Sequence, residues 1–311
     1  MTALTGQLQA IVGPEGVREH APLASLTTFG VGGPADWLVE PRSVAALEAV
    51  LRLAASSDLP VMVLGGGSNV LVADLGVRGM VVRPRLTGIS EPMSGRVRAE
   101  AGVTINGLVR WLIGRGLAGL ESWAGTPGTV GGAIHGNAHY AGRNISEHIV
   151  EVGLLSSRGV LAIVPAAEMG FGYDTSRLFD TSEVVVWADV RVSGGEPDAM
   201  RAVARASLAH RKRTQPLHLP SAGCVFQNPD PTRDRVPMGI PWSAGALVDR
   251  AGLKGASSGG ATISTTHANF IVADKTATAA DIRRLIEQAR DAVRRQFGVE
   301  LKDEIVYLGE W

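Results

Sequence analysis

The stretch that decides the fold is LPVMVLGGGSNVLVAD, residues 59–74, where two short apolar runs flank three consecutive glycines and a Ser-Asn pair. Upstream, PADWLVEP (34–41) is typical of a strand. SVAALEAVLRLAASSD (43–58) predicts a helix, because its apolar residues recur on one face and Ser43 is suited to the N-cap. LPVMVL (59–64) then predicts a short buried strand. This order indicates a β-α-β unit that carries a glycine loop at the end of its second strand.

Two glycine loops are the first sign of a ligand site. GGGSN (65–69) is not a P-loop, since no Gly-Lys-Ser/Thr follows it. GVGGPA (30–35) superficially fits the dinucleotide-binding motif G-x-G-x-x-A. However, Pro34 and a strand-like segment follow where that motif requires a helix. AGTPGTVGGA (124–133) has the same character as GGGSN. Consecutive backbone N–H groups in such loops can form an anion nest, although tight turns alone account for either loop equally well.

The glycines cluster in these loops rather than repeating at a fixed period. There are 39 of them, which exceeds the usual share of roughly 7%. Together with the TTFGVGG turn (27–33), the two loops suggest one large, flat, phosphorylated cofactor approached from several sides, because glycine lets the backbone come close to a ligand. The candidate cofactor-binding residues are Gly65, Gly66, Gly67, Ser68, Asn69, Gly125, Thr126, Pro127, Gly128, Thr129, Gly131, Gly132 and Ala133.

The rest of the chain mixes helices and strands. A hairpin is predicted over 149–164, turning at Ser157 to Gly159, and the segment 119–142 fits neither periodicity. Further strands are predicted over 79–84, 96–103, 182–193, 267–274 and 299–311. Helices are predicted over 105–116 (with Thr104 as its cap), 194–213, 243–252 and 279–297. The pattern predicts an α+β fold with a seam near residue 200 and a second near residue 80.

Composition narrows the classes of function. Thirty basic and thirty acidic residues cancel, which argues against a protein built to bind nucleic acid or an anionic membrane. A single cysteine cannot form an internal disulfide, as expected in a reducing compartment. Residues 1–16 show no signal-peptide pattern, and no segment reaches the roughly 18 apolar residues of a membrane span. We therefore expect a cytoplasmic chain.

Six blocks resemble one family in their order along the chain. They are LTTFGVGGPAD, VLGGGSNVLVAD, AGTPGTVGGAIHGNA, RKRTQPLHLPSAGCVFQNP, HANFIVAD and LKDEIVYLG, and they span roughly residues 20–309. The chain resembles the UDP-N-acetylenolpyruvoylglucosamine reductases, the MurB family of peptidoglycan precursor synthesis. The first three blocks also resemble other flavoproteins of the vanillyl-alcohol-oxidase-like cofactor fold. The SAG-x-VF-x-NP block and the closing strand are more specific to the reductase.

The resemblance implies FAD as the bound cofactor and NADPH as the source of hydride, with UDP-N-acetylglucosamine enolpyruvate reduced to UDP-N-acetylmuramate. It also implies an FAD-binding domain of the vanillyl-alcohol-oxidase-like (PCMH) type in two subdomains, at 1–80 and 81–204, with strand 301–311 returning to the first. A substrate-binding domain is expected at 205–300. The expected partners are small molecules, without nucleic acid or membrane, and the chain is expected to be a monomer. The choice of NADPH over NADH stays open.

The family places a serine, less often a cysteine, in the SAG-x-VF block as a proton donor, and here that position is Cys224. Spacing alone would favour a buried, inert thiol, and the motif favours the general acid. A free thiol has a pKa near 8.5, so it stays mostly protonated at neutral pH yet gives up its proton more readily than an alcohol. Glu304 matches the family's active-site glutamate, whose plainer alternative is a solvated acid. Asp303 beside it makes the register decisive, because only one of the two can point into the site.

The family's arginine is missing from its usual place. The family shows Tyr-Arg-x-Ser where this chain has GYDTS (172–176), so that Asp174 stands in the arginine's position. An acidic residue cannot stabilise the negative charge that grows during the reduction. Arg177 is expected to supply the guanidinium from a shifted loop. A role for Arg211, or an impaired or different activity, remains an alternative.

The resemblance implies further substrate contacts at Tyr173, Arg211, Gln215, Asn228 and Asn269. Arg211 is explained equally well as the basic end of a helix, and Asn269 as a structural residue. His135, His139 and His148 lie near the second glycine loop but lack the spacing of metal ligands, so no metal site is expected.

Two other functions stay open from the sequence. One is a different FAD-dependent sugar or alcohol oxidase of the same cofactor fold, which would consume oxygen without NADPH. The other is a non-catalytic flavin-binding homologue, which the replacement of the family's arginine by Asp174 makes conceivable.

Overall fold

The computed structural model describes residues 3–311, and the chain divides into two compact units. The first unit holds the described part of Met1–Ala21, together with Ala35–Gly66 and Arg78–Ala209. The second holds Pro22–Pro34, Gly67–Val77 and His210–Trp311. Each unit is therefore assembled from separate stretches of chain, and the three-domain division expected from the sequence stays a prediction.

The first unit carries most of a four-stranded sheet whose order is β1 (Val17–Pro22), β2 (Pro34–Val39), β5 (Val77–Val82) and β3 (Val61–Val63). α1 (Ala3–Val12) and α2 (Val44–Ser56) supply Leu8, Leu47 and Val50 to its core. The predicted start of α2 is confirmed, because the Ser43 side chain accepts a hydrogen bond from the Ala46 N–H.

β3 corrects one expectation from the sequence. The prediction of a buried strand at 59–64 is wrong, because Val61 and Val63 are 37% and 43% exposed. The physical reason is that β3 is the edge strand, which pairs in parallel with β5 alone. An apolar run by itself does not distinguish an edge strand from a central one.

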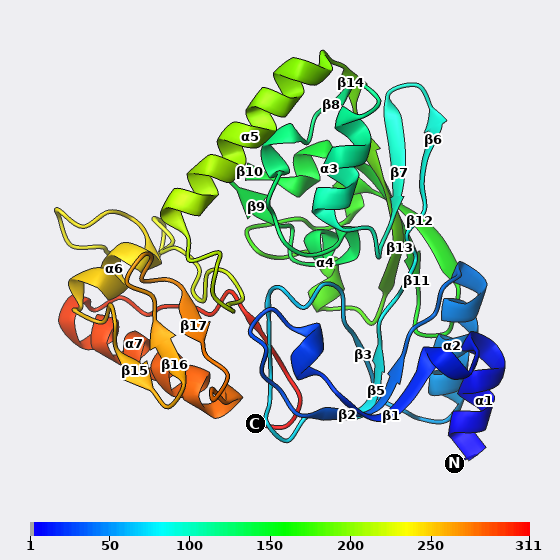
Figure 1. The fold of residues 1–311 in the computed structure, drawn as a ribbon, viewed down its shortest axis with the longest axis horizontal. Helices are drawn as coiled ribbons and strands as arrows, with labels where there is room; N and C mark the ends of the chain where they lie inside the picture. The colour runs from blue at the N-terminus through cyan, green and yellow to red at the C-terminus, as the bar shows by residue number, and fades with distance from the viewer. Residues whose placement is uncertain (1–2) are drawn as a thin grey trace. The chain divides into compact units, whose positions relative to one another are not determined.

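An antiparallel five-stranded sheet forms the larger part of the first unit, in the order β12 (Leu161–Pro165), β11 (Ile149–Leu155), β13 (Val184–Arg191), β7 (Arg96–Glu100) and β6 (Ile89–Met93) (Figure 1). The predicted hairpin is confirmed, since Leu155 pairs with Leu161. The first unit also contains two separate two-stranded sheets. In one, β8 (Leu117–Ala118) pairs with β14 (Ser193–Gly194), and in the other, β9 (His139–Tyr140) pairs with β10 (Arg143–Asn144).

Two helices pack on this sheet, and the second glycine loop lies between them in the sequence. α3 (Ile105–Ile113) begins at Thr104, whose side chain accepts from the Gly107 N–H as predicted. α4 (Val130–His135) contacts β13 and β7 and buries Val130, Ala133 and Ile134. The sequence did not predict α4, and its segment was expected to be irregular. The helix contains two glycines and is too short for a helical period to show.

The second unit contains a three-stranded antiparallel sheet, β15 (Ser257–Ser258), β16 (Ala261–Ile263) and β17 (Ile271–Ala273). α7 (Ala279–Phe297) contacts all three strands, and α6 (Ala244–Arg250) packs on α7 (Figure 1). A capping box between Thr278 and Asp281 begins α7, and Gly298 in a left-handed conformation ends it. α5 (Pro197–Thr214) crosses the boundary of the two units in sequence.

A parallel pair in the second unit joins distant parts of the chain. β18 (Val306–Leu308) pairs with β4 (Val70–Val72), so that Val306 lies opposite Val70. The segment LKDEIVYLG therefore runs beside the strand that follows the GGGSN loop. Among residues 3–311, no helix combines the length and the apolar character that crossing a membrane would need.

Candidate functional site

The two glycine loops predicted from the sequence lie against each other in the first unit. A Cβ atom on Gly65 would come within 2.8 Å of the Thr129 Oγ1 atom. A Cβ atom on Gly66 would come within 2.7 Å of the Gly128 Cα atom. Real Cβ atoms do not approach that closely, so only glycine allows these two backbones to meet.

The second glycine loop is fixed by the start of α3. The Gly125 N–H donates to the Asn106 Oδ1 atom at 2.6 Å, and the Asn106 Nδ2 atom donates to the Thr126 carbonyl at 3.2 Å. The Gly128 carbonyl accepts from the Ile105 N–H at 3.1 Å. The sequence did not indicate Asn106, because its partners lie 19 and 20 positions further along the chain and no motif includes it.

Gly67 and the TTFG turn form a second glycine contact, inside the second unit. Gly67 has a φ of 64°, and a Cβ atom there would lie 2.0 Å from the Leu26 carbonyl oxygen. The Thr28 N–H donates to the Gly67 carbonyl at 2.9 Å. Main-chain N–H groups without flanking side chains, with the buried hydroxyls of Thr126 and Thr129, are donors that fit the phosphates and ring edges of a dinucleotide cofactor.

Asn69, also predicted to bind the cofactor, anchors the C-terminal strand. Its Nδ2 atom donates to the Glu304 carbonyl at 3.0 Å, and its own carbonyl accepts from the Val306 N–H at 2.9 Å. The end of the GGGSN loop therefore holds the backbone of the predicted active-site glutamate.

Cys224 lies half-buried in the second unit, on a segment that Asn269 holds in place. The Asn269 carbonyl accepts from the Val225 N–H at 2.8 Å. Its side chain bonds both backbone groups of Phe226, accepting from the N–H at 2.9 Å and donating to the carbonyl at 2.8 Å. Since Asn269 is only 3% exposed, the structure supports the structural one of its two expected roles.

The segment that carries Glu304 pairs directly with the segment that carries Cys224. The Glu304 N–H donates to the Val225 carbonyl at 2.7 Å, and the Gln227 N–H donates to the Lys302 carbonyl at 2.9 Å. Asp303 forms an isolated antiparallel bridge with Phe226. The two residues that the family resemblance selects, 80 positions apart in sequence, are thus on neighbouring extended strands.

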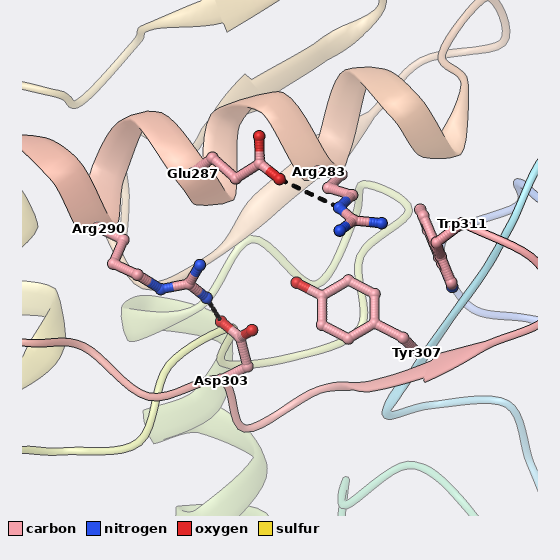
Figure 2. Close-up of a pocket in the computed structure, with 6 residues that line it drawn as sticks. All are labelled: Arg283, Glu287, Arg290, Asp303, Tyr307 and Trp311. Atoms are coloured by element: carbon pink, nitrogen blue, oxygen red, sulfur yellow. Dashed lines mark hydrogen bonds and ion pairs between the residues drawn. The ribbon is translucent and has the colours of Figure 1, made fainter.

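The register of this strand is set by Asp303, which faces α7 (Figure 2). The Arg290 Nη2 atom of α7 donates to the Asp303 carboxylate, and the Arg290 Nε atom donates to the Leu301 carbonyl at 3.2 Å. Burial and the Asp303 carboxylate raise the pKa of Tyr307, whose phenol also bonds Asp303. Asp303 is therefore the one of the two neighbouring carboxylates that the structure shows bonded to α7.

The face of α7 beside Asp303 forms a small pocket whose charges are paired. Its volume is about 260 Å³, and Arg283 Nε donates to Glu287 at 3.1 Å across it. The Arg283 guanidinium also lies 5.0 Å from the centroid of the Trp311 ring. The lining residues are Arg283, Glu287, Arg290, Asp303, Tyr307 and Trp311 (Figure 2). Each guanidinium in the pocket is thus paired with a carboxylate, and the Arg290–Asp303 pair joins α7 to the C-terminal segment.

The loop at 172–176, in the first unit, does not place a guanidinium where the sequence led us to expect one. The Nε and Nη2 atoms of Arg177 donate to the Glu183 carboxylate at 3.0 and 3.1 Å. Asp174 instead contacts His139, with 2.9 Å between the His139 Nδ1 and Asp174 Oδ1 atoms. From the sequence, His139 was interpreted as an ordinary polar residue, because 35 positions separate it from Asp174 and the two residues share no motif.

The other expected substrate contacts are spread over several elements. Tyr173, in the first unit, is 47% exposed. Arg211 is buried in the last turn of α5, and its carbonyl accepts from the Gln215 N–H at 2.9 Å. The Asn228 Oδ1 atom accepts from the N–H of Ala244, the first residue of α6, at 3.1 Å.

Comparisons with known proteins agree with this arrangement. Residues 215–308 match the family described as UDP-N-acetylenolpyruvoylglucosamine reductase, C-terminal domain, and residues 35–164 match an FAD binding domain. UDP-N-acetylenolpyruvoylglucosamine reductase of Carboxydothermus hydrogenoformans is 38% identical over 94% of each chain. That of Moorella thermoacetica is 39% identical over 100% of this chain and 99% of its own. The crystal structure of the Thermus caldophilus reductase (MurB) superposes with a TM-score of 0.77 at 31% identity, covering 94% of this chain and 98% of that one.

Proposed function

This chain belongs to the UDP-N-acetylenolpyruvoylglucosamine reductase family, and from that premise we propose how its residues divide the work of the reaction. It is an FAD-dependent oxidoreductase that reduces the enolpyruvyl group of its UDP-sugar substrate. FAD supplies the hydride chemistry when it is bound, and NADPH is the family's electron donor. The chain itself supplies binding, orientation and a proton.

We assign FAD binding to the glycine contacts described above. Gly65 and Gly66, packed against the 125–133 loop, and Gly67, packed against the TTFG turn, are the proposed cofactor contacts. The support is that a Cβ atom at any of these three glycines would clash with backbone or with Thr129. The glycines therefore keep main-chain donors bare of side chains, which is what a cofactor with two phosphates needs.

Cys224 is the proposed proton donor, and the observation that carries this proposal is the 2.7 Å hydrogen bond from the Glu304 N–H to the Val225 carbonyl. Reduction of the enol ether breaks one carbon–carbon π bond and forms two C–H bonds, one from a hydride and one from a proton. The thiol of Cys224 gives that proton and is left as a thiolate, which regains a proton from water. Glu304, on the paired strand, helps to polarise the enol intermediate.

Arg177 remains the sequence-based proposal for the cation that stabilises the growing negative charge. Its bidentate pair with Glu183 already compensates the guanidinium, so Arg177 can serve only if that pair opens. An Arg177→Ala variant tests the role, because unchanged turnover would remove Arg177 from the catalytic set.

The remaining expectations are also proposals. Tyr173, Arg211, Gln215 and Asn228 are proposed substrate contacts, since they lie on the loops and helix ends nearest in sequence to the proposed catalytic residues. We propose that the chain works as a cytoplasmic monomer on small molecules alone. Its product, UDP-N-acetylmuramate, would feed peptidoglycan synthesis and hence cell shape and division.

The test of the function is an absorption spectrum of the purified protein followed by an NADPH oxidation assay. A bound yellow flavin and NADPH oxidation that depends on UDP-N-acetylglucosamine enolpyruvate are expected. A colourless protein that cannot be loaded with FAD would refute the proposal. Oxygen consumption without NADPH would support the oxidase alternative, and flavin without turnover would support the non-catalytic homologue.

A further inference from the structure

A buried carboxylate and an imidazole are paired at the loop where the guanidinium was expected. His139 Nδ1 and Asp174 Oδ1 are 2.9 Å apart, and their side chains are 28% and 9% exposed. Among residues 3–311, the second carboxylate oxygen of Asp174, Oδ2, is buried without a hydrogen-bond partner. Burying a carboxylate with incomplete hydrogen bonding costs free energy, so a purely structural role explains this residue poorly.

Three residues in the segments that carry the pair have positive φ angles, which are strained for residues other than glycine. Asp174 has a φ of 53°, Asn137 of 45° and Ala141 of 51°. These are three of the five described non-glycine residues with positive φ, and two of them, Asn137 and Asp174, take part in the side-chain contacts between the segments 137–139 and 172–174. Left-handed non-glycine residues are uncommon and cluster at binding and catalytic sites.

The loop is tied to the segment that follows the glycine loop. The Ser176 Oγ atom donates to the carbonyl of His135, the last residue of α4, at 2.6 Å. The Asn137 Nδ2 atom donates to the Gly172 carbonyl at 2.6 Å. These two bonds hold the loop against the segment that leads from the end of α4 to His139, four residues further along the chain.

We propose that His139 binds the carboxylate of the substrate and stabilises the charge that grows there, and that Asp174 is the residue that positions it. With Nδ1 directed to Asp174, the ring turns Nε2 toward a second partner, and in the imidazolium form both nitrogens donate. The Tyr173 ring, with its centroid 5.2 Å from that of His139, limits rotation of the imidazole. The inference rests on the proposed function, since it assigns one more residue to the same reaction.

The test compares His139→Ala, Asp174→Asn and the double variant with wild type. Asparagine tolerates the left-handed backbone at 174, so Asp174→Asn removes the charge without new strain. His20→Asn is the matched control, because His20 is exposed and also has a positive φ of 48°. Each protein is loaded with FAD, and stopped-flow absorbance measures reduction by NADPH and reoxidation by substrate separately. Calorimetry measures the affinity of the oxidised protein for UDP-N-acetylmuramate, whose carboxylate needs no turnover to be bound.

His139→Ala is expected to slow reoxidation by substrate about 100-fold, as the loss of one charge-stabilising donor does, and to weaken product binding. Reduction by NADPH should change by less than about twofold. Asp174→Asn should slow reoxidation about tenfold, and the double variant should be no slower than His139→Ala, because Asp174 acts only through the imidazole. Added imidazole should restore part of the rate of His139→Ala, and the control should match wild type.

A His139→Ala protein with wild-type reoxidation and product affinity would overturn the proposal. So would a double variant whose defect is the product of the two single defects, since that would mean independent roles. If His139→Ala fails to retain FAD, His139→Gln and Asp174→Asn decide the question by the same two readouts. Failure of the proposed function would show separately, as wild-type protein that does not oxidise NADPH when substrate is added.

Discussion

The segment around Cys224 and the loop at 172–176 are held in opposite ways. Main-chain hydrogen bonds from Glu304 and Gln227, together with the buried Asn269 amide, fix the Cys224 segment. Within the other loop, one main-chain hydrogen bond runs from the Gly172 N–H to the Thr175 carbonyl at 3.0 Å, and side chains, above all Ser176 and the Asp174 carboxylate, tie the loop to its neighbours. The side chain at position 224 is therefore replaceable without moving its backbone, whereas each polar side chain of the other loop also determines its shape.

Cys224→Ala is the sharpest way to break this comparison. Loss of a general acid should slow reoxidation by substrate by about 10²–10⁴-fold. Flavin content, reduction by NADPH and thermal stability should stay near wild-type values, because main-chain groups and the Asn269 amide supply the hydrogen bonds that hold the segment. Stopped-flow absorbance and a thermal melt make the two measurements.

Cys224→Ser is the matched control for that prediction. It restores a proton donor of lower acidity and should recover part of the lost rate. Equal rates for the alanine and serine variants would deny position 224 a role in proton transfer, and a large fall in melting temperature for both would deny that the main chain holds the segment.

Asn269→Ala should have the next largest effect, on stability rather than on chemistry. It removes two hydrogen bonds and leaves the N–H and carbonyl of Phe226 buried without partners, which costs about 2–4 kcal/mol of unfolding free energy. Urea unfolding measures the loss. Asn269→Asp should also destabilise the protein, because it places a buried carboxylate against the Phe226 carbonyl oxygen. An alanine variant as stable as wild type would show that Asn269 does not hold the segment.

Ser176→Ala tests the opposite side of the comparison. The hydroxyl donates to the His135 carbonyl at 2.6 Å and is 2% exposed, so its removal should cost about 1 kcal/mol of unfolding free energy. Because side chains hold this loop, we also expect a raised KM for the UDP-sugar, measured by steady-state NADPH oxidation. A stability loss with an unchanged KM would separate the loop from substrate binding.

The smallest expected effect is a pH dependence contributed by one histidine beside each segment. Burial lowers the pKa of His135, and burial with the nearby Lys254 charge lowers that of His267, which accepts from the Asn269 N–H at 3.2 Å. A lowered folded-state pKa means that the unfolded chain takes up protons first as pH falls. The stabilising effect is therefore complete above about pH 6.5 and is lost progressively below it.

Urea unfolding at about pH 7.5 and about pH 5.5 measures this loss, which should be near 1 kcal/mol or less for each histidine. His135→Gln should reduce the difference between the two conditions, because glutamine does not titrate. An undiminished difference in that variant would assign the pH dependence to other groups.

How much the sequence predicts also follows from the way each region is built. The starts of α2 and α3 and the β11–β12 hairpin all follow from local patterns. The exposure of β3 does not, because edge and central strands share the same apolar letters. Cys224 and Glu304 could be selected because their motifs survive, and their register could not, because it depends on Arg290 in a helix.

The His139–Asp174 pair lies beyond sequence reasoning for a different reason. Its two members sit in loops with irregular backbone, and the left-handed conformations that bring them together are not encoded by glycine. Asn106 was missed for the same reason, since one side chain bonding two backbone groups of a distant loop leaves no period or spacing to detect.

The parallel pairing of β4 with β18 has a consequence for how the protein is made. Asn69 and Glu304, which are bonded in the finished molecule, are 235 positions apart. During synthesis on the ribosome, β4 emerges long before the strand that covers it, and such long-range closure is slow relative to local structure formation. A nascent chain interrupted before residue 304 lacks both the proposed catalytic carboxylate and the strand that completes its second unit. Acquisition of activity therefore has to await synthesis of residues 304–308, which carry Glu304 and β18.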